Sequence, residues 1–172
     1  MLQSFFPMPK QFFTSAVAWS LAAIFLWYFG GKELGAVFGL QFPDKDASPV
    51  IGLGHFATDD FIWFYLYYSF FTLIFYGFWA NYAPHKWQLW SILGSALILF
   101  FTYFQVQVAV AVNNWYRPFY DAIQNALSNE STTTAGDLYG YMFSFLILAM
   151  TYVLFSVLTS FFVSHYIFRW RT

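Results

Sequence analysis

Charged residues divide this chain into long uncharged stretches. Four stretches of at least 21 residues contain no Asp, Glu, Lys or Arg: 11–31, 61–85, 87–116 and 138–168. A helix of about 20 apolar residues spans the roughly 30 Å hydrocarbon core of a bilayer. The pattern therefore predicts four transmembrane helices, near 12–31, 61–83, 87–113 and 138–168.

Composition supports an all-α integral membrane protein over residues 1–172. The chain is 60% hydrophobic, 27% aromatic and 9% charged, whereas soluble domains carry about 25% charged residues. A soluble helical bundle would need a charged stripe on each helix, which the four stretches lack. A secretory signal after Lys10 is the other alternative. That apolar run ends in Trp-Tyr-Phe-Gly-Gly rather than at a small-residue cleavage site, so we expect it to stay as an anchor.

The loops predict an orientation with both termini inside. The N-terminal segment, the 84–86 turn and the C-terminal end hold no acidic residue and four basic ones, Lys10, Lys86, Arg169 and Arg171. Such segments stay cytoplasmic. The other two loops hold Lys32, Lys45, Arg117 and all eight acidic residues, Glu33, Asp44, Asp46, Asp59, Asp60, Asp121, Glu130 and Asp137. These two loops are then expected outside. Their acidic residues either attract cationic solutes to an outer mouth, or the loops are simply hydrated.

The sequence lacks the residues that several kinds of functional site require. There is no cysteine, the three histidines His55, His85 and His165 lie far apart, and no phosphate-binding Gly-rich loop occurs. We therefore expect no metal, no cofactor and no nucleic-acid partner. No cluster of titratable groups lies within a span, which argues against a membrane-embedded enzyme and against proton coupling by these residues.

A polar stripe follows the third predicted helix at steps of three and four: Ser91, Ser95, Ile98, Thr102, Gln105, Ala109 and Asn113. Lipid cannot satisfy the amides of Gln105 and Asn113, so they should face other helices or a water-filled cavity. The small residues would instead let helices pack closely. A polar lumen and plain packing both remain open.

A short helix near 118–128 is predicted to follow the third span in the outer interface. Pro118 suits the first position of a helix, and Asp121 favours its positive N-terminal end. Asp137 is expected to cap the last span.

Four strings resemble the SbmA/BacA family of bacterial peptide-antibiotic transporters. They are "SFFPMP" at 4–9, "YAPHKWQLWSILGSALI" at 82–98, "AVNNWYRPFYDAIQNAL" at 111–127 and "FFVSHYIFRWRT" at 161–172. They combine rare Trp, Tyr, Pro and Asn positions, and they run in order along nearly the whole chain.

The resemblance implies a multi-pass protein of the bacterial inner membrane, arranged like the first part of an ABC-exporter transmembrane domain without an ATPase domain. It implies a homodimer that imports peptides with the proton gradient, including cationic or proline-rich antimicrobial peptides, microcins and bleomycin-like compounds. In the family the chain continues beyond "FRWR", so this chain is expected to be the N-terminal part of a longer protein.

Two sets of site residues are expected. The substrate pathway would be lined by Gln105, Asn113, Asn114, Tyr116, Arg117 and Asp121. The membrane interface would be held by Trp87, Trp90, Arg169, Trp170 and Arg171. The alternative function is a non-transporting membrane subunit, or an inactive fragment, that works only with a partner chain.

Overall fold

The computed structural model describes residues 5, 6, 8–40, 48–128 and 133–171. Three of the acidic loop residues, Asp44, Asp46 and Glu130, lie outside the described residues, as does Lys45. The described part is all-helical and contains no strand, which confirms the predicted all-α class. Four helical segments are long and apolar enough to cross a membrane: Pro9–Gly31, Asp59–Tyr82, Leu89–Leu127 and Ala135–Arg171.

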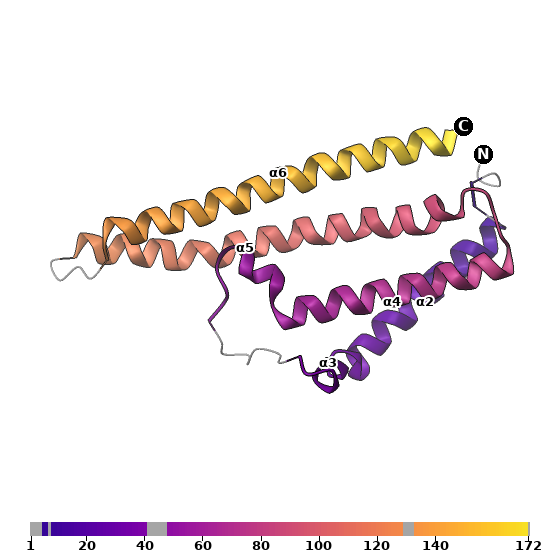
Figure 1. The fold of residues 1–172 in the computed structure, drawn as a ribbon, viewed down its shortest axis with the longest axis horizontal. Helices are drawn as coiled ribbons and strands as arrows, with labels where there is room; N and C mark the ends of the chain where they lie inside the picture. Colours follow the sequence, from indigo (N-terminus) through magenta and orange to yellow (C-terminus); the bar gives the residue numbers. More distant parts are fainter. Residues whose placement is uncertain (1–4, 7, 41–47, 129–132, 172) are drawn as a thin grey trace. The chain divides into compact units, whose positions relative to one another are not determined.

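The element order follows the chain from α2 to α6 (Figure 1). The long α-helices are α2 (Pro9–Leu26), α4 (Asp59–Tyr82), α5 (Ser95–Leu127) and α6 (Ala135–Arg171). Two π-helical segments, η1 (Trp27–Gly31) and η3 (Leu89–Gly94), extend α2 and precede α5. The short helices α3 (Leu34–Val37) and η2 (Gly52–Ala57) lie in the connection between α2 and α4.

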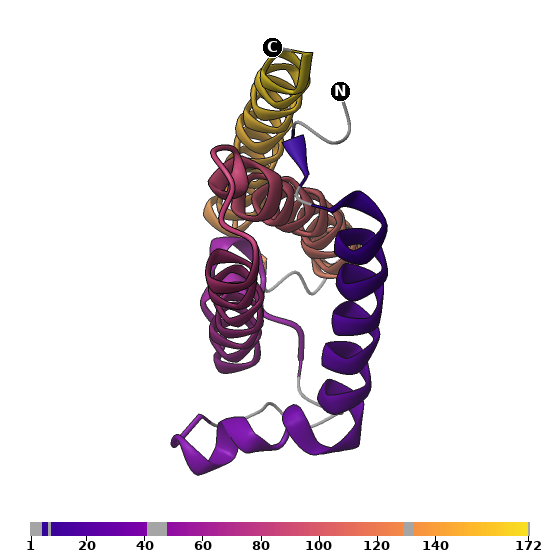
Figure 2. The same cartoon turned by 90° about the vertical axis from the view of Figure 1, so that its right-hand side faces the viewer.

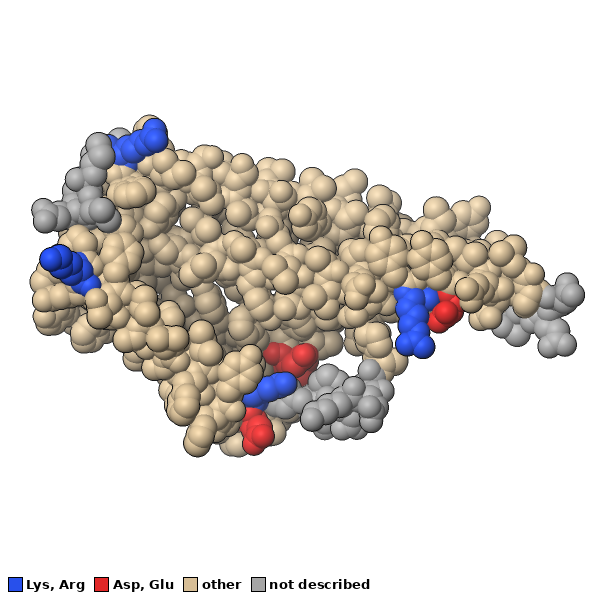
Figure 3. All heavy atoms as spheres, turned by 180° about the vertical axis from the view of Figure 1, so that it is seen from behind, with Lys and Arg blue, Asp and Glu red and all other residues tan. Residues whose placement is uncertain are grey.

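Two compact units make up the chain. Unit 1 comprises 1–43, 59–100 and 161–172, and unit 2 comprises 44–58 and 101–160. Wide areas of the face seen in Figure 3 carry no charged atoms. Many large apolar side chains are exposed along the helices, as expected where lipid rather than water covers them.

Aromatic side chains hold α2 against α4 in unit 1. Trp19 Nε1 donates to the Phe71 carbonyl at 3.0 Å, and the Tyr67 hydroxyl donates to the Ala23 carbonyl at 2.7 Å. Trp63 Nε1 donates to the carbonyl of Gly31 at 2.9 Å. Gly30 has φ 138°, a conformation that glycine adopts readily, and there the chain turns so that α3 lies across the end of α2 (Figure 2).

The core of unit 1 is built around Phe5 and Trp79, each only 1% exposed. Phe6, Phe12 and Ile92 complete this buried cluster. The indole of Trp79 also donates to Ser15 Oγ at 3.2 Å. The core therefore explains why the N-terminal string places two phenylalanines before α2: their rings fill the space beside α4 and η3.

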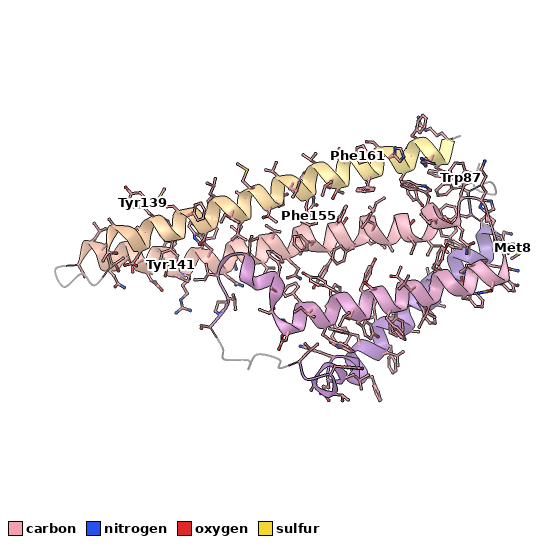
Figure 4. The ribbon with its side chains drawn as sticks, in the orientation of Figure 1. Met8, Trp87, Tyr139, Tyr141, Phe155 and Phe161 are labelled. Atoms are coloured by element: carbon pink, nitrogen blue, oxygen red, sulfur yellow. The ribbon has the colours of Figure 1, made fainter. Side chains whose placement is uncertain are left out.

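In unit 2, the later part of α5 and the earlier part of α6 run antiparallel. Phe155 points from α6 toward α5 (Figure 4), where its ring stacks on Phe104 with centroids 4.1 Å apart. Trp115 is buried, and its Nε1 donates to the Tyr141 carbonyl at 2.7 Å. Val108 of α5 and Leu148 of α6 are also fully buried. This interface sets the register of α5 against α6 within unit 2.

The structure differs from the sequence analysis at Pro118. A separate helix near 118–128 was predicted, but α5 continues unbroken through Pro118 to Leu127. Proline suits a first helical turn, yet it also occurs inside helices, where it removes one hydrogen bond to the carbonyl four residues earlier. Here that carbonyl belongs to Asn114, and the flanking residues remain helical.

Candidate functional site

An open cavity of about 720 Å³ lies at the end of the α5–α6 pair in unit 2. From α5 it is lined by Pro118, Asp121, Ala122 and Asn125, and from the α6 side by Thr133, Gly136, Asp137, Gly140, Tyr141 and Ser144; Ile51 completes it. Among the described residues, its lining includes two carboxylic acids and no Lys or Arg. The cavity therefore suits a cationic or hydrogen-bond-donating ligand group.

Asp121 and Asn125 face the cavity from the same side of α5. They are one helical turn apart, which places both on one face, and both are exposed. Ala122 is buried against the helix pair. The cavity wall on α5 thus combines a carboxylate and an amide with the buried Ala122.

Asp137 is held at the start of α6. Its Oδ2 accepts hydrogen bonds from the backbone N–H of Thr134 at 2.8 Å and from the Thr134 hydroxyl at 2.7 Å. In return, the N–H of Asp137 donates to Thr134 Oγ1 at 3.3 Å. This is a reciprocal capping box, so Thr134 caps the helix and Asp137 supports the cap from its first turn.

The same hydrogen bonds keep Asp137 ionised. The backbone and hydroxyl donors of Thr134 lower the pKa of Asp137 below its usual value. α6 is 37 residues long, about 55 Å at 1.5 Å per residue, which exceeds a bilayer crossing. The cavity consequently keeps a negative charge at neutral pH.

Asp121 alone among the expected pathway residues lines the cavity. Tyr116 and Arg117 are exposed on α5, where Tyr116 stacks on Tyr120 with centroids 6.1 Å apart. Asn113 is exposed and Asn114 is half-buried. The cavity does not gather these four residues.

Gln105 faces α6 within unit 2. Its Nε2 donates to Thr159 Oγ1 at 3.3 Å, and that hydroxyl donates to the Phe155 carbonyl at 2.7 Å. At the start of the stripe, Ser95 Oγ lies 2.8 Å from the Tyr166 hydroxyl in unit 1. These contacts support the packing interpretation for Ser95 and Gln105, while Thr102, Ala109 and Asn113 are exposed.

The expected interface residues include a close group in unit 1. The guanidinium carbon of Arg169 lies 4.8 Å from the ring centroid of Trp90 and 5.7 Å from that of Trp87. Arg169 Nε donates to His165 Nε2 at 3.0 Å. Trp170 and Arg171 are exposed at the end of α6.

Sequence reasoning missed several of these residues. The pairing of His165 with Arg169 follows from their i, i+4 spacing on a helix, a signal that was present in the sequence. Asn125 and Ser144 carry no such signal, because their shared cavity depends on the register of α5 against α6. Among the described residues, no group of three or more His, Asp or Glu side chains could hold a metal ion.

The family model described as SbmA/BacA-like matches residues 84–172, just over half of the chain. The chain belongs to the SbmA/BacA-like family. This match confirms the resemblance carried by the sequence strings, and it includes all of α5 and α6, hence nearly the whole cavity lining. The family is one of membrane transporters rather than enzymes, in agreement with the four apolar helices.

Proposed function

We propose that this protein takes part in importing peptides across the bacterial inner membrane, driven by the proton gradient. Membership of the SbmA/BacA-like family carries the proposal. The acidic cavity supports it, because ionised carboxylates at a pathway entrance raise the local concentration of cationic peptides. Proline-rich antimicrobial peptides, microcins and bleomycin-like compounds are the proposed substrates.

The proposed arrangement is a homodimer with both termini inside, built like the first part of an ABC-exporter transmembrane domain. The cavity would then open on the outer face, where Asp121 and Asp137 meet the incoming peptide. The apolar stretches of this chain contain no carboxylate. We therefore place proton coupling on groups other than the residues of these four spans.

Uptake by right-side-out vesicles from the protein's own membranes tests this function. A labelled cationic peptide should accumulate inside and should be lost when an uncoupler dissipates the proton gradient. Asp121→Asn should lower the initial uptake rate of that peptide by about threefold and should leave uptake of a neutral peptide unchanged. One carboxylate gives only a small part of the rate increase that a whole charged cleft produces.

Two further variants sharpen the comparison. Asn125→Asp adds a carboxylate to the same cavity and should raise uptake of the cationic peptide. Glu33→Gln removes an exposed acid outside the cavity lining and should have no effect. Equal losses for cationic and neutral peptides would exclude the electrostatic role of Asp121, whereas accumulation that survives the uncoupler would exclude proton-driven import.

A further inference from the structure

A short helical segment, residues 32–40, follows the apolar stretch of α2 in unit 1 and contains α3. It starts after Gly30, whose φ of 138° turns the chain away from the axis of α2. At its other end, the N–H of Leu40 donates to the carbonyl of Gly35 at 3.2 Å, and the N–H of Gly39 donates to the following carbonyl at 3.1 Å. With Gly39 at φ 81°, this is a Schellman motif, which closes a helix. The 32–40 segment is therefore a defined element rather than irregular chain.

Trp63 of α4 holds the 32–40 segment at both ends. Its Nε1 donates to the carbonyl of Gly31, the residue before the segment, at 2.9 Å, and its ring stacks on Phe38 with centroids 5.5 Å apart. Trp63 comes about one turn after Asp60, in the charged start of α4. Carboxylates are costly in the hydrocarbon core, whereas Trp is enriched at the boundary with the headgroups. The stacking therefore brings Phe38 to the level of that boundary.

The side chains of the 32–40 segment form two faces. Leu34, Val37 and Phe38 have i, i+3, i+4 spacing and share one face. All three are exposed, Val37 by 79% and Phe38 by 73%. At about 100° per residue, Lys32 lies on the opposite side of the helix, and it is exposed as well. An apolar face opposite a basic residue is the pattern of a helix that lies in the plane of a membrane surface.

The surface next to the segment favours lipid as the cover of its apolar face. Tyr28 and Phe29, at the end of the α2 stretch, are both exposed, so apolar surface continues from that stretch onto the segment. The stretch Pro9–Gly31 is itself long and apolar enough to cross a membrane. Lipid that surrounds it therefore reaches the face of Leu34 and Val37 without interruption, whereas covering that face with water would be unfavourable.

We propose that the 32–40 segment lies in the plane of the bilayer interface. Leu34, Val37 and Phe38 contact acyl chains, while Lys32 points to the headgroups and water. The turn at Gly30 and the contacts of Trp63 set this depth. The proposal depends on α2 and α4 crossing the membrane. It is independent of peptide import and of which side the termini occupy, so either proposal can fail without the other.

Electron paramagnetic resonance of spin-labelled protein tests the position of the segment. Because the sequence has no cysteine, Leu34→Cys, Val37→Cys and Lys32→Cys each carry a single nitroxide in the full chain. None of these side chains is buried, so the substitutions should not impair folding. In vesicles of phosphatidylglycerol and phosphatidylcholine, power saturation compares collisions with oxygen, which concentrates in lipid, and with nickel ethylenediamine diacetate, which stays in water.

The labels on the two faces should behave differently. At Leu34 and Val37, oxygen collisions should dominate and give a depth of about 5–10 Å, the usual depth of an interfacial apolar face. Lys32→Cys is the matched control on the same segment, where collisions with the nickel chelate should dominate.

Three results would overturn the proposal. Dominant nickel collisions at all three positions would place the segment in water. Few collisions with either probe at Leu34 and Val37 would mean that protein, such as a second copy of this chain, covers the apolar face. Dominant oxygen collisions at all three positions would place the segment inside the hydrocarbon core rather than in the plane of its surface.

Discussion

At the scale of single residues, two polar side chains of α5 find partners on α6. Gln105 donates to Thr159, and Ser95 pairs with Tyr166. The sequence predicted that the amide of Gln105 needs a partner, since lipid offers none. It could not predict which partner, because residues 105 and 159 are far apart in the sequence. Only the register of α5 against α6 brings them together.

The Gln105–Thr159 contact should contribute a measurable coupling. Gln105→Leu and Thr159→Val each remove one side of the hydrogen bond while keeping similar bulk. In a double-mutant cycle on thermal unfolding in detergent, we expect a coupling of about 0.6 kcal/mol, the average for hydrogen bonds between membrane helices. The Gln105→Leu protein should still reach the membrane while its transport falls. Unchanged transport together with a positive coupling would show that Gln105 serves packing alone.

At the scale of elements, the uncharged stretches predicted the existence and order of all four long helices. The reason is physical: a charge inside a hydrocarbon core is costly, so charges mark where spans end. The ends themselves were less predictable. Asp59 and Asp60 begin α4 and Arg169 and Arg171 end α6, in line with the helix dipole. Pro118 fits both the first turn and the interior of a helix, and the surrounding sequence could not distinguish the two positions.

Pro118 should weaken α5 locally beside the cavity. In Pro118→Ala the carbonyl of Asn114 regains a backbone donor, and the helix gains a residue of high intrinsic propensity. We expect amide hydrogen exchange of Phe119 to Asp121 to slow by at least tenfold. Gly140→Ala is the control: no atom lies within 4 Å of the added Cβ, so it should stabilise α6 and leave exchange in α5 unchanged. Unaltered exchange in Pro118→Ala would mean that the proline is neutral for α5.

At the scale of the whole molecule, the fold brings together cavity residues that the sequence does not group. Asp121 was identified because acidic residues gather in the predicted outer loops. Its cavity companions Asn125 and Ser144 were not, because a single polar residue on a helix indicates neither a lumen nor a surface. Family membership supplies the transporter role, while the arrangement of the spans in the bilayer is a matter of topology. The basic residues of the loops predict that topology.

The absence of cysteine makes the topology directly measurable. Single cysteines can be placed at described, exposed positions: Met8, Glu33, Pro84, Asn125 and Arg171. With both termini inside, Glu33→Cys and Asn125→Cys should react with a membrane-impermeant maleimide in spheroplasts. Met8→Cys, Pro84→Cys and Arg171→Cys should react only after permeabilisation. Replacing Glu33 should not disturb orientation, because basic rather than acidic residues set it.

Each neighbouring pair of these positions tests one crossing. Labelling of Pro84→Cys and Asn125→Cys from the same side would show that the segment from Leu89 to Leu127 does not cross the membrane. If that side is the inside, the cavity no longer lies on the outer face. A complete reversal of the pattern would keep four crossings but place the cavity inside. Asp121 and Asp137 could then no longer collect cationic peptides for import, so the orientation decides whether the acidic cavity is an entrance.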